Sequence, residues 1–166
     1  MRRDRVTGIA ALPVTAGAFR ISDLHYCALP DRSGAAADRG AAWRHDYLAL
    51  REAVAGSPIV TYNPDFVRQM ILRTCRVNRL AAFDGEWIDL AAAAALVGSE
   101  HGELTTMGYW LERMRSGGRS PHDAAYDVFA MAQLLEAVLA YAADAGMETV
   151  ESLVHRQDVR ASLGGQ

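Results

Sequence analysis

The chain has 166 residues, of which 51% are hydrophobic, and its formal net charge is −3. This length supports one domain with a sizeable core, and the hydrophobic content excludes a disordered tail. The negative charge argues against a broad electrostatic grip on nucleic acid, although all 17 basic residues are arginines, whose planar guanidinium groups bind phosphate well.

The cysteines and the apolar runs indicate the cellular compartment in which the protein is expected. Cys27 and Cys75 have neither a metal-type spacing nor a disulfide framework, and their apolar neighbours predict two buried thiols. No long apolar run follows the charged first residues, which argues against a signal peptide. The apolar run from Leu90 to Val97 is too short to cross a bilayer, so we expect no membrane span and a cytoplasmic protein.

The first half of the chain predicts strands and then helices. Two apolar segments, residues 6–14 and 18–29, flank Thr15-Ala16-Gly17 and predict a β-hairpin within residues 1–30, followed by a loop. Beyond the loop, one face of a helix that ends near Gly56 is marked by apolar residues spaced four, three and four apart: Trp43, Tyr47, Leu50 and Val54.

A buried strand over residues 59–62 is predicted to lead into a helix that runs to about Leu80, with Asn63 as its cap and Pro64 at its first position. We expect one apolar side of this helix to hold Phe66, Met70 and Val77. The same segment contains Arg68, Arg73, Arg76 and Arg79. These arginines fit a path for phosphates, but a solvated face is favoured because no aromatic residues are interleaved with them.

In the second half, an extended piece at residues 86–90 is predicted to feed an alanine-rich helix to Val97. Further helices are expected at 104–114, from Pro121 to about Ala143, and from Glu148 to about His155. The inner face of the long helix is assigned to Val128, Ala132, Leu135 and Leu139. The sequence thus predicts a single mixed α/β domain over residues 1–166, with helices and short strands at 41–155 and a tail at 156–166.

His122 and Asp127 lie near the start of this long helix, with Ser120 and Pro121 as its predicted cap and first position. A histidine and a carboxylate in such an arrangement can act as general base and metal ligand in phosphodiester hydrolysis. The alternative interpretation is an ordinary capped helix with two exposed polar residues. Taken by itself, this short motif favours that alternative.

Several segments together resemble the DEDDh 3′–5′ exonucleases, a group that includes proofreading exonucleases and ribonuclease-T-like enzymes. His122 and Asp127 match the histidine and aspartate of the family's third motif. The second motif is similar to the segment Val60-Thr61-Tyr62-Asn63-Pro64-Asp65-Phe66. Residues 3–11 and 87–90 resemble further strands of that family. The resemblance implies a ribonuclease-H-like fold, in which a mixed central sheet is flanked by helices.

By the same resemblance, His122 would be the general base and Asp127 a catalytic residue that binds Mg²⁺ or Mn²⁺. Asn63, Phe66 and Tyr62 would shape the substrate cleft. The family's first strand carries Asp-x-Glu and would lie before Arg2, and Val67 stands where the second motif has its aspartate. Asp65 lies two residues earlier, roughly 200° away around the helix, and is a poor substitute.

These departures favour a degenerate exonuclease whose phosphodiester hydrolysis is impaired or absent and which holds one cation weakly or no cofactor. A truncated active enzyme is the competing explanation. The alternative function is a non-catalytic module that binds nucleic acid, a nucleotide or a protein. The expected partners are a DNA or RNA 3′ end or a nucleotide, together with a homodimer or another chain that supplies the missing strand.

Overall fold

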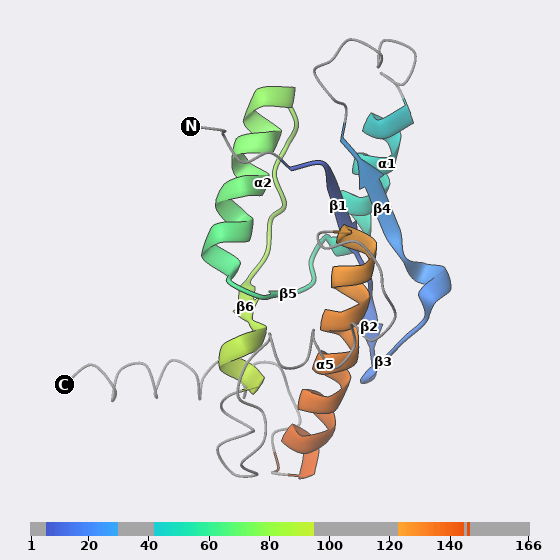
Figure 1. The fold of residues 1–166 in the computed structure, drawn as a ribbon, viewed down its shortest axis with the longest axis vertical. Coiled ribbons are helices and arrows are strands. Elements are labelled where there is room, and N and C mark those ends of the chain that lie inside the picture. The colour runs from blue at the N-terminus through green and yellow to red at the C-terminus, as the bar shows by residue number, and fades with distance from the viewer. Residues whose placement is uncertain (1–5, 30–41, 95–122, 145, 147–166) are drawn as a thin grey trace, which may run out of the picture.

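The computed structural model describes residues 6–29, 42–94, 123–144 and 146, which form a mixed α/β arrangement (Figure 1). The predicted loop at 30–40, the helices at 104–114 and 148–155, and the tail lie outside these residues. Within them the strands form three two-stranded sheets. The expectation of one mixed central sheet is therefore not met in the described part of the chain, while the α/β class is confirmed.

The predicted hairpin is present, with an interruption in its middle. Strands β1 (Gly8–Ala11) and β4 (His25–Ala28) pair antiparallel, and the shorter β2 (Val14–Thr15) and β3 (Ala18–Phe19) pair at the tip. A short 3₁₀ helix, Ile21–Asp23, links β3 to β4. The tip turns at Ala16 and Gly17, whose φ angles of 52° and 78° are those of a tight turn that suits the twist of a hairpin.

Helix α1 (Ala42–Val54) packs on this hairpin and buries the face that its spacing predicts. Trp43, Tyr47 and Leu50 are buried, while Val54 is only partly buried. They join a cluster that we call the N-terminal core, which consists of Ile9, Cys27, Trp43, Tyr47, Leu50, Ile71 and Cys75. Both cysteines are buried free thiols, as the sequence predicted.

The second structural unit is a β–α–β segment. Strand β5 (Ile59–Thr61) pairs in parallel with β6 (Trp87–Asp89), and α2 (Pro64–Asn78) connects them. Asn63 caps α2 by accepting the backbone N–H of Phe66 at 3.4 Å, and Pro64 follows at the first helical position, as predicted. Residues 90–94, directly after β6, are helical.

The apolar side of α2 that holds Phe66, Met70 and Val77 is not the side that packs against the core. Phe66 and Val77 are 54% and 61% exposed, whereas Ile71 and Cys75 are buried and Val67 packs against the N-terminal core. The residues at 67, 71 and 75 are spaced four apart and form a second apolar stripe, turned by about 100° from the one through Phe66. Contacts with α1 and the hairpin select this second stripe.

Helix α5 (Ala124–Asp144) contacts β1 and covers the second core cluster. This cluster combines residues of the segment after β6 with the helix itself: Leu90, Ala93, Ala94, Leu134, Val138 and Ala142. Of the predicted inner face, Ala132 is buried, and Val128, Leu135 and Leu139 are partly buried. The inward side is thus broader than the predicted stripe and includes Leu134 and Val138.

By length and composition alone, α5 is long and apolar enough to cross a membrane. This corrects the expectation that no segment of the chain is long and apolar enough to do so. The helix reaches this threshold because its charged residues are few and widely spaced along 21 residues. In the fold, 22% of its apolar window is buried.

Candidate functional site

The carboxyl ends of β5 and β6 form the centre of the candidate site. Thr61 ends β5 and lies opposite Asp89, which ends β6. Among the described residues, Thr61 is the one polar residue that is buried, with an exposed fraction of 7%. The Asp89 carboxylate accepts the backbone N–H of Ala91 at 2.9 Å and so caps the helical residues that follow. In open α/β sheets, ligands bind beyond the carboxyl ends of the strands.

Helix α5 reaches this strand end through one side-chain contact. The hydroxyl of Thr61 lies 3.9 Å from the sulfur of Met131. Asp127 precedes Met131 by one helical turn, on the same side of α5. The contact therefore brings two segments that are about 70 residues apart in the chain, β5 and the first turns of α5, to one place.

Asp127 is half-buried in the first turn of α5, and its backbone N–H donates to the carbonyl of Asp123 at 2.9 Å. The Asp123 carboxylate accepts the N–H of Ala125 at 3.0 Å. Both carboxylates lie at the helix end where the dipole favours negative charge. His122, the predicted general base, lies outside the described residues.

The three predicted substrate-binding residues follow β5 directly. Asn63 has a left-handed backbone (φ 52°), and its side-chain oxygen serves as the cap of α2. Tyr62 and Phe66 are 42% and 54% exposed. All three thus lie on the surface at the start of α2. Sequence reasoning overlooked Thr61 and Asp89, although both could have been found as polar residues next to the last position of a predicted strand.

The donor atoms of the described residues do not fit a two-metal centre. No group of three His, Cys, Asp or Glu side chains that could hold a metal occurs among them. Asp84 and Glu86 have Asp-x-Glu spacing, but they lie in the loop before β6, and the Asp84 side chain is 92% exposed and 3.8 Å from Arg51. Two-metal hydrolysis needs several carboxylates around cations about 4 Å apart.

Val67 stands where the resemblance predicts the second-motif aspartate, and its surroundings are apolar. The side chain is half-buried and packs against the N-terminal core. Asp65, the neighbouring carboxylate, is exposed. The position is therefore a packing position, and no carboxylate replaces Val67 from within α2.

In the N-terminal core, a polar network surrounds the buried side chain of Tyr47. Its hydroxyl donates to the carbonyl of Ala81 at 2.6 Å and lies 2.9 Å from the sulfur of Cys75. Burial, with the Cys75 contact second, raises the pKa of Tyr47. Burial, followed by the nearby Asp46, raises the pKa of the Cys27 thiol to about 11. Cys27 is therefore protonated at neutral pH, which excludes it as a thiolate nucleophile.

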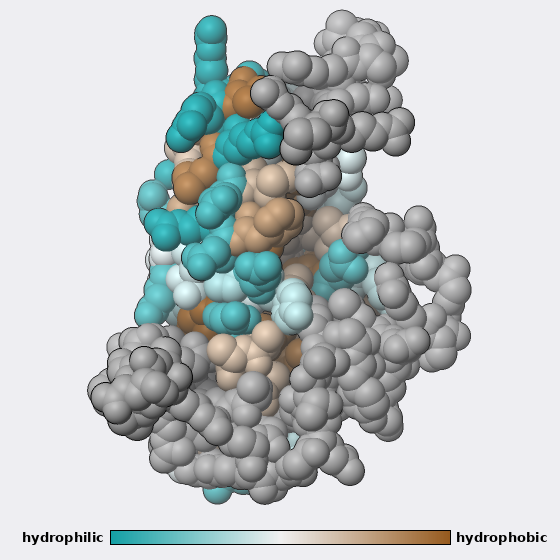
Figure 2. All heavy atoms as spheres, turned by 60° about the vertical axis from the view of Figure 1, so that its left-hand side comes forward, coloured by the Kyte–Doolittle hydropathy of each residue, from teal (hydrophilic) through white to brown (hydrophobic). Residues whose placement is uncertain are grey.

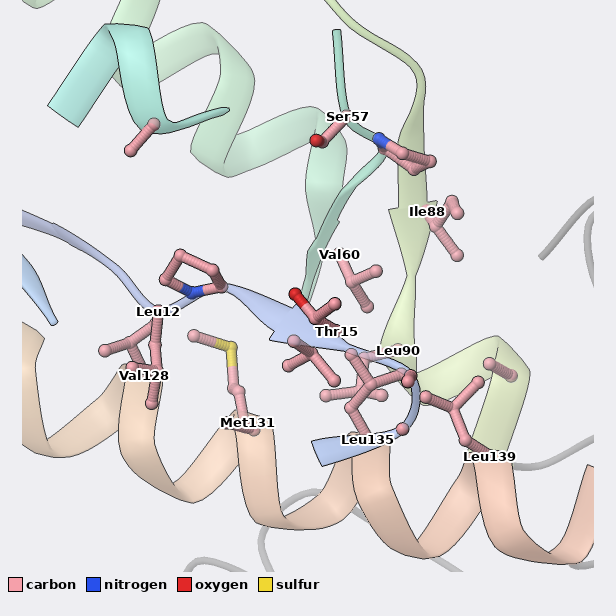
Figure 3. A pocket seen from close by; sticks show the side chains of 18 of the residues that line it. Leu12, Thr15, Ser57, Val60, Ile88, Leu90, Val128, Met131, Leu135 and Leu139 are labelled. Carbon is pink, nitrogen blue, oxygen red and sulfur yellow. The ribbon is translucent and has the colours of Figure 1, made fainter. Parts of the chain in front are cut away.

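A groove of about 640 Å³ separates the hairpin tip, α5 and the β5–β6 pair (Figure 3). Met131, Leu135 and Leu139 of α5 point toward Val60 and Leu90 across it. The bond from the N–H of Ile59 to the carbonyl of Glu86 fixes the direction of the β5 peptide groups. In a parallel pair, the N–H and C=O of Val60 then point away from β6. Among the described residues, no backbone group pairs with Val60 on that side, so the apolar walls of the groove lie next to an unpaired strand edge.

No protein-family model, no curated protein and no solved structure matches this chain.

Proposed function

We propose that this chain is a 3′–5′ exonuclease-like protein of the DEDDh type with a ribonuclease-H-like fold, and that its metal-dependent hydrolysis is impaired or absent. The order of elements supports the fold: an antiparallel hairpin, a helix, two parallel strands joined by a helix, and a long final helix. The contact between Thr61 and Met131 supports the functional part, because Asp127 precedes Met131 by one helical turn and Tyr62 and Asn63 directly follow Thr61.

The chemistry available at this place is limited. By resemblance, His122 would accept a proton from water, and Asp127 would bind Mg²⁺ or Mn²⁺, which would activate that water. The described residues add no carboxylates that would complete such a centre, and Val67 contributes packing instead. A site of this kind retains surfaces for a nucleic-acid end, namely Tyr62, Phe66 and Asn63, but lacks the ligands for efficient hydrolysis.

The second candidate function is a non-catalytic module that binds nucleic acid, a nucleotide or a protein. The packing of Val67 favours it, since an apolar residue at that position serves stability and not catalysis. A complete exonuclease would depend on Asp127 for nucleotide release, whereas neither a degenerate exonuclease nor a non-catalytic module would.

The assay uses short 5′-labelled DNA and RNA strands with a free 3′-hydroxyl, incubated with Mn²⁺. We expect the wild-type chain and Asp127→Asn to release nucleotides equally slowly, while both bind the strands. Release that is fast in the wild type and abolished by Asp127→Asn would identify a complete enzyme and refute the proposed degeneration. Absence of binding at low salt would refute nucleic acid as the ligand.

A strand from a second copy of this chain is our proposed occupant of the groove. Its support is the open edge at Val60, because only an extended backbone can pair with it while apolar side chains fill the walls. In hydrogen exchange, the Val60 amide should exchange quickly in the monomer and slowly in the dimer, whereas the Ile59 amide, bonded to Glu86, should be slow in both. A monomer at all concentrations would refute the dimer.

A further inference from the structure

Helix α2 carries, besides its buried side, an apolar stripe that is exposed. Phe66 and Val77 are 54% and 61% exposed, and Met70 lies between them, partly buried. With Arg73 they follow one another in steps of four, three and four residues, so at ~100° per residue all four lie within about 60° of arc. Figure 2, in which the α2 side is turned forward, shows hydrophobic residues set among hydrophilic ones down this side. We call these four residues the α2 stripe.

The spacing of the α2 stripe fits a second helix. Steps of four and three residues average 3.5, which is the repeat of the seam between paired helices. The eleven residues from Phe66 to Val77 span about 16 Å at ~1.5 Å per residue, or about three turns. A helix surface has no unpaired backbone edge, so an extended strand would find nothing to pair with here. Side chains of another helix can instead pack between those of the stripe.

Arg73 gives the α2 stripe its charge. The guanidinium group is exposed and forms no ion pair with a residue that the structure describes. Its neighbours one helical turn away carry no carboxylate: Gln69, Met70, Arg76 and Val77. A partner with a carboxylate opposite Arg73 would therefore complement the stripe.

The charge of α2 argues against a second copy of this chain as the partner. The helix contains Arg68, Arg73 and Arg76 but only one acidic residue, Asp65. Two copies paired through the stripe would bring an excess of positive charge together, and like charges across an interface repel. The partner that fits is a different chain, with an apolar side and a negative charge.

We propose that the α2 stripe docks an amphipathic helix of another protein, which has apolar residues in steps of four and three and a carboxylate opposite Arg73. The apolar side chains of that helix cover Phe66, Met70 and Val77, while the carboxylate pairs with the guanidinium group and fixes the register. The inference goes beyond the proposed function and shares only Phe66 with it. Its tests use Arg73 and Val77, which have no part in that function, so either can fail without the other.

The probe is a fluorescent synthetic helix of about 20 residues, because isolated helices shorter than ~12–15 residues are marginal. It carries leucines in steps of four and three, a glutamate at the central position of that stripe, and alanine and glutamine elsewhere. One control peptide has glutamine in place of the glutamate. A second has a central proline, which breaks the helix. Fluorescence anisotropy measures the affinity of each peptide for the full chain.

The variants form two matched pairs. Val77→Ser removes an apolar side chain of the stripe, and Leu72→Ser removes one that is 40% exposed but lies outside it. Arg73→Gln removes the charge of the stripe, and Arg68→Gln removes an exposed charge outside it. Each control lies five residues before its partner, about 140° away around the helix. Circular dichroism and thermal melting establish that all four variants are folded.

We expect Val77→Ser to weaken binding of the glutamate peptide about tenfold, and Leu72→Ser to leave it nearly unchanged. The wild-type chain should prefer the glutamate peptide to the glutamine peptide by about threefold, a preference that Arg73→Gln abolishes and Arg68→Gln retains. The proline peptide should bind much more weakly. Equal losses in Val77→Ser and Leu72→Ser, a glutamate preference that survives Arg73→Gln, or no binding by the wild-type chain would overturn the proposal.

Two further measurements separate the other possible occupants. In sedimentation of the chain alone, any self-association should be the same in the wild type, Val77→Ser and Leu72→Ser. Self-association that only Val77→Ser abolishes would assign the stripe to a second copy and overturn the proposal. Polyglutamate should displace the peptide poorly compared with unlabelled peptide, because it lacks the apolar side chains. Equal displacement would show attraction by charge alone and would also overturn it.

Discussion

Val67→Asp introduces the carboxylate that the proposed exonuclease resemblance would require at this position, and its consequence depends on where the side chain lies. The valine is half-buried against the N-terminal core. Its apolar burial contributes about 1 kcal/mol, because a fully buried valine contributes about 1.5–3 kcal/mol and this side chain is only half-buried. Partial burial of a polar group without a partner costs about 1–3 kcal/mol more. We therefore expect a loss of about 2–4 kcal/mol in the free energy of unfolding at pH 7.

Urea denaturation at pH 7 and at pH 4 measures this loss, with Val67→Thr and the exposed Asp65→Asn as controls. Burial raises the pKa of an introduced carboxyl, so its destabilising effect should shrink as the pH falls and the group is protonated. Val67→Thr keeps the shape and should lose less. A Val67→Asp variant that is as stable as Val67→Thr at pH 7 and is further stabilised by Mn²⁺ would show that this position faces a cleft.

Three further predictions concern the N-terminal core and the start of α2. Tyr47→Phe should lower the free energy of unfolding by about 1 kcal/mol in urea, because the part-buried hydrogen bond from its hydroxyl to the carbonyl of Ala81 is lost. Folding raises the pKa of Cys27 from 9.0 to about 11, so the contribution of its neutral thiol to stability is complete below pH 9 and is lost as the pH rises through 11. Between pH 9 and pH 11, the free energy of unfolding should therefore fall more for the wild-type chain than for Cys27→Ala. Asn63→Ala should cost about 1 kcal/mol through the lost cap and lower the melting temperature, and an unchanged melting temperature would contradict the capping role.

Local signals were enough to predict the hairpin, α1 and the start of α2. A turn with glycine between apolar segments, one apolar stripe through Trp43 and Tyr47, and an Asn-Pro pair each act over a few residues. Their outcome is fixed by backbone geometry and by one dominant apolar face. The structure confirms the hairpin, although its strands are interrupted, and α1 and the start of α2 lie within a residue or two of their predicted bounds.

The parts that were mispredicted depend on contacts distant in sequence. Two apolar stripes on α2 had similar hydrophobicity, and only packing against α1 and the hairpin places Ile71 inside and Phe66 outside. The contact of Thr61 with Met131 joins residues 70 positions apart, so no local pattern signals it. The division into three sheets likewise follows from how the hairpin and the β5–β6 pair lie around the groove.

The packing of Val67 and the exposure of Phe66 are consequences of the same orientation of α2. Successive helical residues are turned by about 100°, so a helix that directs position 67 into the N-terminal core directs position 66 to solvent. A carboxylate at position 67 would be directed into the core unless α2 rotated. Such a rotation would also withdraw Phe66 from the surface it now shares with Arg73. The packing of position 67 and the exposure of Phe66 are thus coupled, and we expect any variant whose carboxylate at position 67 is turned out of the core to have a less exposed Phe66 ring.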